Sequence, residues 1–150
     1  MQDKNVYPIT VFFHKETTTL NKLHEVANRE IPQLYEEIAK LGVKEIAPMQ
    51  FRYIGCTPDL DKEFELEIGV IVDQVKEYNG KFDFKEWGPM KCVSHVFTGP
   101  VSKLGGEYEK IFPQIFQSGK QPSDEVREVY TKFVDMESPE NITEIQIGLN

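Results

Sequence analysis

A glutamate and a tyrosine two residues apart, Glu128 and Tyr130, are the residues of this chain best suited to chemistry. They lie in the pattern Val126 to Val134, which predicts a strand, so both side chains should point to one face. A carboxylate buried among aromatic rings is costly to keep charged without a partner. It can pair with an organic cation, which ring faces also attract, or accept a proton in a reaction. A solvated strand residue is the alternative.

Two other aromatic residues could line the same site. Tyr53 and Tyr130 occupy corresponding places in two similar stretches of the chain, and Trp87 stands directly before the Gly88-Pro89 turn signal. Ordinary packing remains open for Tyr130, Tyr53 and Trp87. The predicted ligand-binding residues are therefore Glu128, Tyr130, Tyr53 and Trp87, and Glu128 is the catalytic candidate in the case of an enzyme.

Other residue types that carry chemistry point to structural roles. His14 and His95 lie in strand patterns without a nearby serine or cysteine, which favours structural histidines. Glu63, Glu65 and Glu67 share a strand face but no histidines cluster with them, so we expect a solvated row. There is no Gly-rich phosphate loop. The sequence thus predicts no metal site and no cofactor.

Composition excludes several classes of protein. The chain has 150 residues and a formal net charge of −8, with lysines and arginines spread throughout. This argues against direct binding of nucleic acid, which needs a basic footprint. No apolar run is long enough to span a membrane, and the N-terminus does not resemble a signal peptide. Cys56 and Cys92, far apart in sequence, fit reduced thiols in a cytoplasmic protein.

Two amphipathic helices are predicted, over residues 20–41 and 102–117, closed by Gly42 and Gly119. Each contains a proline, Pro32 or Pro113, near which we expect a kink or break. Strands besides 126–134 are predicted at Val6–His14, Met49–Gly55, Phe64–Asp73, Met90–Phe97 and Thr143–Leu149.

Alternation within the strands predicts which side chains face the helices. Leu66, Ile68 and Val70 should do so, because they form the apolar set of their strand. In the strand 126–134 the set with Val129 and Phe133 is the more apolar one. Glu128 and Tyr130 should then point away from the helices.

Two blocks of sequence recur at nearly the same spacing along the chain. Lys22-Leu23 recurs as Lys103-Leu104, and the segment Leu66 to Val70 resembles Ile145 to Leu149. The match suggests one half-domain used twice, over about residues 5–73 and 81–149 of a single domain. Each half reads strand, helix, strand, strand. We therefore predict an α+β fold of duplicated βαββ units, with an antiparallel curved sheet, both helices on one face and a ligand cleft between the halves.

Several motifs resemble those of the GyrI-like small-molecule-binding domains, which also serve as effector-binding domains of AraC- and MerR-type regulators. The resemblance runs over about residues 5–149 and rests on four segments. These are His95 to Leu104 followed by Tyr108, Arg127-Glu128-Val129-Tyr130, Glu67-Ile68-Gly69-Val70, and Pro139 with Thr143 to Leu149. The first departs from the family pattern by one extra residue between His95 and Gly99.

The resemblance implies an aromatic cleft that binds lipophilic, often cationic, small molecules, with Glu128 as its glutamate. No DNA-binding motif accompanies it, so a standalone sensing or sequestering protein is expected. The alternative is a hydrolase of cyclopropane-type or related small substrates in the same cleft, with Glu128 as proton acceptor. A weaker alternative is a partner-binding protein that resembles gyrase inhibitors.

Overall fold

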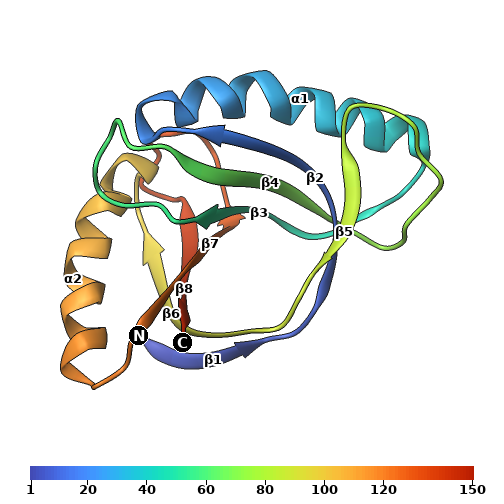
Figure 1. Ribbon diagram of the computed structural model, residues 1–150. Coiled ribbons are helices and arrows are strands. Elements are labelled where there is room, and N and C mark those ends of the chain that lie inside the picture. The colour runs from blue at the N-terminus through green and yellow to red at the C-terminus, as the bar shows by residue number, and fades with distance from the viewer. The chain divides into compact units, whose positions relative to one another are not determined.

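The computed structural model describes all residues, Met1 to Asn150, as two helices and eight strands (Figure 1). The chain divides into two compact units. Unit 1 comprises Met1–Tyr7 and Pro89–Asn150, and unit 2 comprises Pro8–Gly88. Every strand pair within a unit is antiparallel. The predicted α+β class is confirmed.

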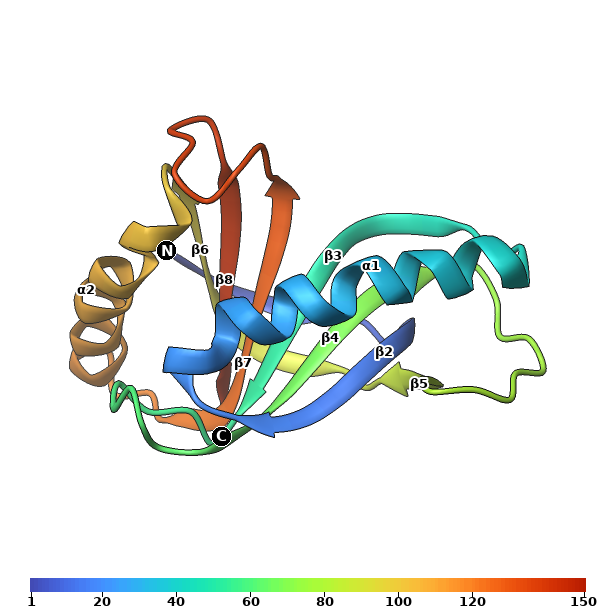
Figure 2. The same cartoon turned by 90° about the horizontal axis from the view of Figure 1, so that it is seen from above.

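Unit 2 contains the order strand, helix, strand, strand, followed by one short strand. In its sheet β4 lies between β3 and β2, and β5 pairs with the other side of β2. Helix α1 lies along this sheet (Figure 2). The elements are β2 (Ile9–Thr18), α1 (Leu23–Leu41, after a 3-10 turn at Leu20–Lys22), β3 (Glu45–Ile54), β4 (Phe64–Val72) and β5 (Asp83–Trp87).

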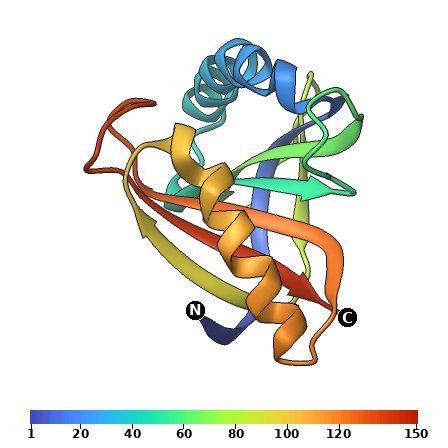
Figure 3. The same cartoon turned by 90° about the vertical axis from the view of Figure 1, so that its left-hand side faces the viewer.

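Unit 1 has the same order, preceded by a strand from the N-terminus. In its sheet β6 lies between β1 and β8, and β7 pairs with the other side of β8. Helix α2 crosses one face of this sheet (Figure 3). The elements are β1 (Gln2–Val6), β6 (Met90–Thr98), α2 (Leu104–Gln117, after a 3-10 turn at Val101–Lys103), β7 (Pro122–Lys132) and β8 (Ile142–Leu149).

Each helix buries its apolar side on its own sheet. In unit 2, Leu34 of α1 and Leu66 and Ile68 of β4 are completely inaccessible to solvent. Ile68 pairs with His14, which contacts Glu30 of α1, so Leu66 and Ile68 face this helix as predicted. In unit 1 the buried cluster joins α2 to β6 and β8. Its members are Val93, Leu104, Ile111, Ile115, Ile145 and Ile147.

Both helices continue through their prolines, so neither helix breaks there, and a kink near either proline stays a prediction. In both, the glutamine after the proline supplies a side-chain donor to the backbone. Gln33 Nε2 donates to the carbonyl of Arg29 at 2.9 Å, and Gln114 Nε2 to that of Lys110 at 3.2 Å. These bonds add polar contacts in the turn where proline lacks its own N–H. Gly42 ends α1 with φ of 72°, as predicted for a glycine that closes a helix.

The N-terminal strand differs from its prediction. The expected strand Val6–His14 is interrupted at Tyr7-Pro8. Val6 ends β1, and the residues from Ile9 onward belong to the longer β2, which lies in the other unit. Proline has no N–H for a strand ladder, which accounts for the interruption. Neither helix is both long and apolar enough to cross a membrane.

Candidate functional site

The site in unit 1 is built on rows of side chains across three strands. In one row His95 of β6 pairs with Ile145 of β8, and Ile145 pairs with Glu128 of β7. In the next row Tyr130 pairs with Thr143. Directly paired residues point to the same face of a sheet, so Glu128 and Tyr130 share a face, as predicted.

That face is the one covered by α2. The hydroxyl of Tyr108, on α2, donates to Glu128 Oε2 at 2.6 Å, and the hydroxyl of Tyr130 donates to Glu128 Oε1 at 2.7 Å. Val126, on the same side of β7, packs against the buried cluster beneath α2. The prediction that Glu128 points away from the helices is therefore wrong.

The error has a physical reason. Phe133 lies beyond the end of β7 and is 53% exposed, so it gave no information about the direction of the strand. Arg127, on the opposite face, is 1% exposed, and its Nε donates to Glu125 Oε2 at 2.9 Å. The number of apolar residues on each face of this strand therefore did not predict which face the helix covers, because each face buries one charged residue with polar partners.

Glu128 is 6% exposed and accepts a phenol hydrogen bond on each carboxylate oxygen. Hydrogen bonds to a carboxylate stabilise its charged form, but neutral phenols do not cancel the charge. The ring of Tyr108 also stacks against Phe112 with centroids 6.2 Å apart. The result is a fixed carboxylate with aromatic neighbours, which suits an organic cation or a reaction that needs a proton acceptor.

Tyr53 belongs to unit 2 and is buried. It pairs with Leu66, so it lies on the α1 side of its sheet. Its ring is 5.6 Å from that of Phe64 and 6.4 Å from that of Phe51. Tyr53 is thus part of an aromatic group within this unit.

Trp87 also belongs to unit 2 but lies on the other face of its sheet. It packs with Val11, Phe13 and Ile71, and it is fully buried. Its ring lies over Gly69, where a Cβ atom would come within 2.7 Å of the indole. Within unit 2 the structure therefore places Tyr53 and Trp87 on opposite faces. Their roles in ligand binding remain predictions.

The row of glutamates on β4 is not uniformly solvated, contrary to expectation. Glu67 is 2% exposed and accepts from Arg52 Nη1 at 2.8 Å and from Lys85 Nζ at 2.5 Å. Lys85 Nζ also lies 4.7 Å from the ring centre of Phe13. β4 is an inner strand of unit 2, and a carboxylate there needs such partners.

Each strand histidine pairs with a glutamate of the helix in its unit. His95 Nε2 lies 2.9 Å from Glu107 Oε1 of α2, and His14 Nδ1 lies 3.3 Å from Glu30 Oε1 of α1. The contact with His95 and the contact of Lys110 with the other oxygen lower the pKa of Glu107. A structural role for both histidines stays a prediction, and their glutamate partners were not foreseen.

Two important residues escaped the sequence reasoning. Tyr108 formed part of the family resemblance but was not among the predicted site residues. Glu30 was not noticed, although the spacing that relates Leu23 to Leu104 makes it the counterpart of Ile111, a core residue of α2. A glutamate at the position that corresponds to a core isoleucine could have identified Glu30 as an unusual buried charge.

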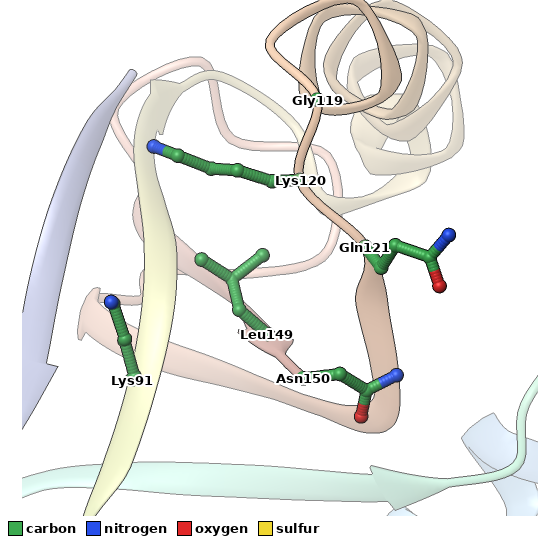
Figure 4. A pocket seen from close by; sticks show the side chains of 6 residues that line it. All are labelled: Lys91, Gly119, Lys120, Gln121, Leu149 and Asn150. Carbon is green, nitrogen blue, oxygen red and sulfur yellow. The ribbon is translucent and has the colours of Figure 1, made fainter.

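A hollow of about 320 Å³ opens elsewhere in unit 1, beside the end of β8 (Figure 4). It contains none of the four predicted site residues. Its lining is Lys91, Gly119, Lys120, Gln121, Leu149 and Asn150. Lys91 and Lys120 are its charged side chains, and Lys120 forms an ion pair with Asp3.

The cysteines and acidic residues form no further chemical site. The thiol of Cys56 donates to the carbonyl of Thr57 at 3.6 Å, and burial raises the pKa of Cys92 to about 11, which disfavours its nucleophilic thiolate form. No three His, Cys, Asp or Glu side chains are grouped so as to hold a metal ion.

No protein-family model and no curated protein sequence matches this chain. Solved structures do. The EcmrR C-terminal domain superimposes with a TM-score of 0.83 at 19% identity, over 99% of this chain and 96% of that domain. This chain therefore has the same fold as the EcmrR C-terminal domain.

A longer EcmrR chain, solved as an EcmrR–DNA complex, matches with a TM-score of 0.82 at 19% identity, over 99% of this chain. This chain spans 56% of that chain's length. SAV2435, solved bound to tetraphenylphosphonium, matches with a TM-score of 0.64 at 23% identity, over 99% of this chain and 93% of that one. A hydrolase from Listeria innocua gives a TM-score of 0.64 at 10% identity, over 99% of this chain and 92% of that one.

Proposed function

We propose that this protein binds small lipophilic organic cations, and that the carboxylate of Glu128 is their charge partner. The observation that carries the proposal is a glutamate, 6% exposed, whose two oxygens are held by the hydroxyls of Tyr108 and Tyr130. Phenols orient the carboxylate without neutralising its negative charge. Sensing or sequestration would both follow from such binding.

Access to Glu128 requires movement of a tyrosine, because little of the carboxylate reaches solvent. In this proposal the ligand displaces the hydroxyl of Tyr108 and places its positive charge beside the carboxylate. The displaced ring and Tyr130 then offer aromatic surface to the ligand, with a cation–π attraction of about 0.5–2 kcal/mol. Tyr53 and Trp87 remain candidate aromatic contacts, each to be tested separately.

The neighbour bound to tetraphenylphosphonium supports this ligand class at the level of a shared fold. Tetraphenylphosphonium is also a suitable probe, because it is a quaternary cation surrounded by four aromatic rings. The charge of such a probe does not change with pH, so binding reports only on the protein.

The test compares charged and neutral ligands on matched variants. Glu128→Gln should weaken tetraphenylphosphonium binding at least about tenfold, since close charge pairs at buried interfaces couple by about 1.5–7 kcal/mol. Binding of neutral triphenylphosphine oxide should change much less. Glu140→Gln, which removes a charge at a side chain 68% exposed, is the control. Calorimetric titration of each protein with each ligand measures the difference, and equal losses for both ligands would contradict the proposal.

A hydrolase is the second candidate, favoured by the fold it shares with the Listeria innocua hydrolase. Glu128 would then accept a proton from water, and Tyr108 or Tyr130 would donate to the developing negative charge on the substrate. Turnover of a cyclopropane or ester substrate that Glu128→Gln abolishes would establish this reading. Cation binding without turnover would exclude it for those substrates.

A further inference from the structure

We propose that the His95–Glu107 pair positions Tyr108 over Glu128, and that protonation of His95 weakens cation binding at Glu128. This inference rests on the proposed function and adds a positioning residue to it. His95 touches neither Glu128 nor the proposed ligand. It acts through α2 and through its charge.

The geometry places both contacts on one row of the sheet. Consecutive residues of α2, Glu107 and Tyr108, contact the two outer residues of the row His95–Ile145–Glu128. The helix is thus attached to β6 at one residue and to β7 at the next. Any change at Glu107 alters the position from which Tyr108 reaches the carboxylate.

The groups that face His95 can be named along this row. α2 contributes Glu107, whose Oε2 is also held by Lys110 Nζ at 3.1 Å. β8 contributes Ile145, which carries no charge, and β7 contributes Glu128 at the far end of the row. Adjacent strands are about 4.8 Å apart, so the backbones of His95 and Glu128 are about 10 Å apart across β8.

Two effects of protonation act in the same direction. A protonated His95 makes a charge-assisted bond to Glu107, which holds this turn of α2 in place and keeps Tyr108 on Glu128. Its positive charge also repels a cation about 10 Å away in a partly buried setting. Loss of the proton from His95 at higher pH weakens both effects. Cation affinity should therefore rise with pH.

The chain offers a matched control in its other unit. His14 is the counterpart of His95 at the repeat spacing, lies on the strand that precedes α1, and also contacts a helix glutamate. A variant at His14 removes the same kind of contact in unit 2. It should leave the pH dependence of binding unchanged.

The experiment measures tetraphenylphosphonium affinity from pH 5.5 to 8.5. In the unmodified protein we expect a rise of about threefold to tenfold, the size set by charges about 10 Å apart with solvent screening. His95→Gln should bind at every pH as tightly as the unmodified protein does at high pH. His95→Lys, which keeps a positive charge throughout, should bind weakly at every pH. A purely structural role would instead weaken binding in both variants.

The inference is overturned if His95→Gln keeps the rise with pH, or if His14→Gln abolishes it. An absence of any Glu128-dependent binding in the unmodified protein would instead remove the proposed function. In that case the positioning of Tyr108 by His95 can still be tested in the ligand-free protein. The ¹³Cζ signal of Tyr108 should follow the imidazole titration of His95, and should lose this dependence in His95→Gln. A Tyr108 signal that ignores the titration would refute the inference.

Discussion

Glu30 is a buried carboxylate of α1 whose charge is stabilised by three partners. It is completely inaccessible, and it contacts Arg29, Lys81 and His14. Burial disfavours its charged form, but hydrogen bonds from Lys81 and Arg29 outweigh this and lower the pKa of Glu30. Lys81 lies just before β5 and is exposed, so Glu30 also ties this loop to α1. A charge at a core position is thus tolerated because three partners converge on it.

Glu30→Gln should lower the free energy of unfolding at pH 7 by about 1–3 kcal/mol, because its charged hydrogen bonds are lost. A carboxyl group with a lowered pKa stabilises the fold above its unfolded value of 4.5, and this contribution disappears as the pH falls through the folded value. The unmodified protein should therefore lose more stability between pH 5 and pH 3 than the variant. Urea unfolding at both pH values measures this.

Glu36→Gln provides the control for the loss of one charge on the same helix. Its side chain is 67% exposed and forms an ion pair with Lys40 one turn away. Such exposed pairs contribute about 0.3–0.5 kcal/mol. A similar loss of stability in both variants would mean that the contacts of Glu30 have no special effect.

At the scale of elements, periodicity predicted the helices and the longer strands, whereas the assignment of strand faces was correct for β4 and wrong for β7. Spacings of three and four predicted both helices, and alternation predicted the six longer strands, because these patterns follow from backbone geometry. The short β1 and β5 escaped prediction because strands of five residues carry little pattern. The direction of Glu128 escaped because it depends on Tyr108, which is distant in sequence and supplies the hydrogen bond that makes burial tolerable. Local sequence does not encode such a partner.

Gly69 allows the ring of Trp87 to pack closely against β4. Gly69→Ala would place a Cβ atom 2.7 Å from the indole ring, so either the ring or the strand must shift. We expect the free energy of unfolding to fall by about 1–3 kcal/mol. Trp87 is the only tryptophan in the chain, so its fluorescence should change in the folded variant.

Gly105→Ala is the matched control, because nothing lies within 4 Å of a Cβ atom at that helical position. Alanine favours a helix over glycine by about 1 kcal/mol, so this variant should be as stable as the unmodified protein or more so. Combining Gly69→Ala with Trp87→Phe should give less than the sum of the two losses. Strict additivity would show that the two side chains do not compete for space.

At the scale of the whole molecule, the two units do not follow the order of the chain. β1 comes from the N-terminus but pairs with β6 of unit 1, which is formed by the second half of the sequence. Two ion pairs strengthen the link, between Lys4 and Glu144 and between Lys120 and Asp3. The N-terminal residues therefore complete unit 1, while unit 2 is formed by one continuous segment.

Removal of Met1–Val6 should consequently destabilise unit 1 in preference to unit 2. The deletion exposes the edge of β6 and removes the hydrogen bond from Lys4 Nζ to Glu144 Oε2, which measures 2.8 Å. Amide hydrogen exchange followed by mass spectrometry should show faster exchange in β6 and β8, with β2 and β4 close to the unmodified protein. Lys4→Met, which removes the ion pair but leaves the strand, should give a smaller effect in the same strands. Equal acceleration in all four strands would contradict this prediction, because it would mean that the two units open as one cooperative body.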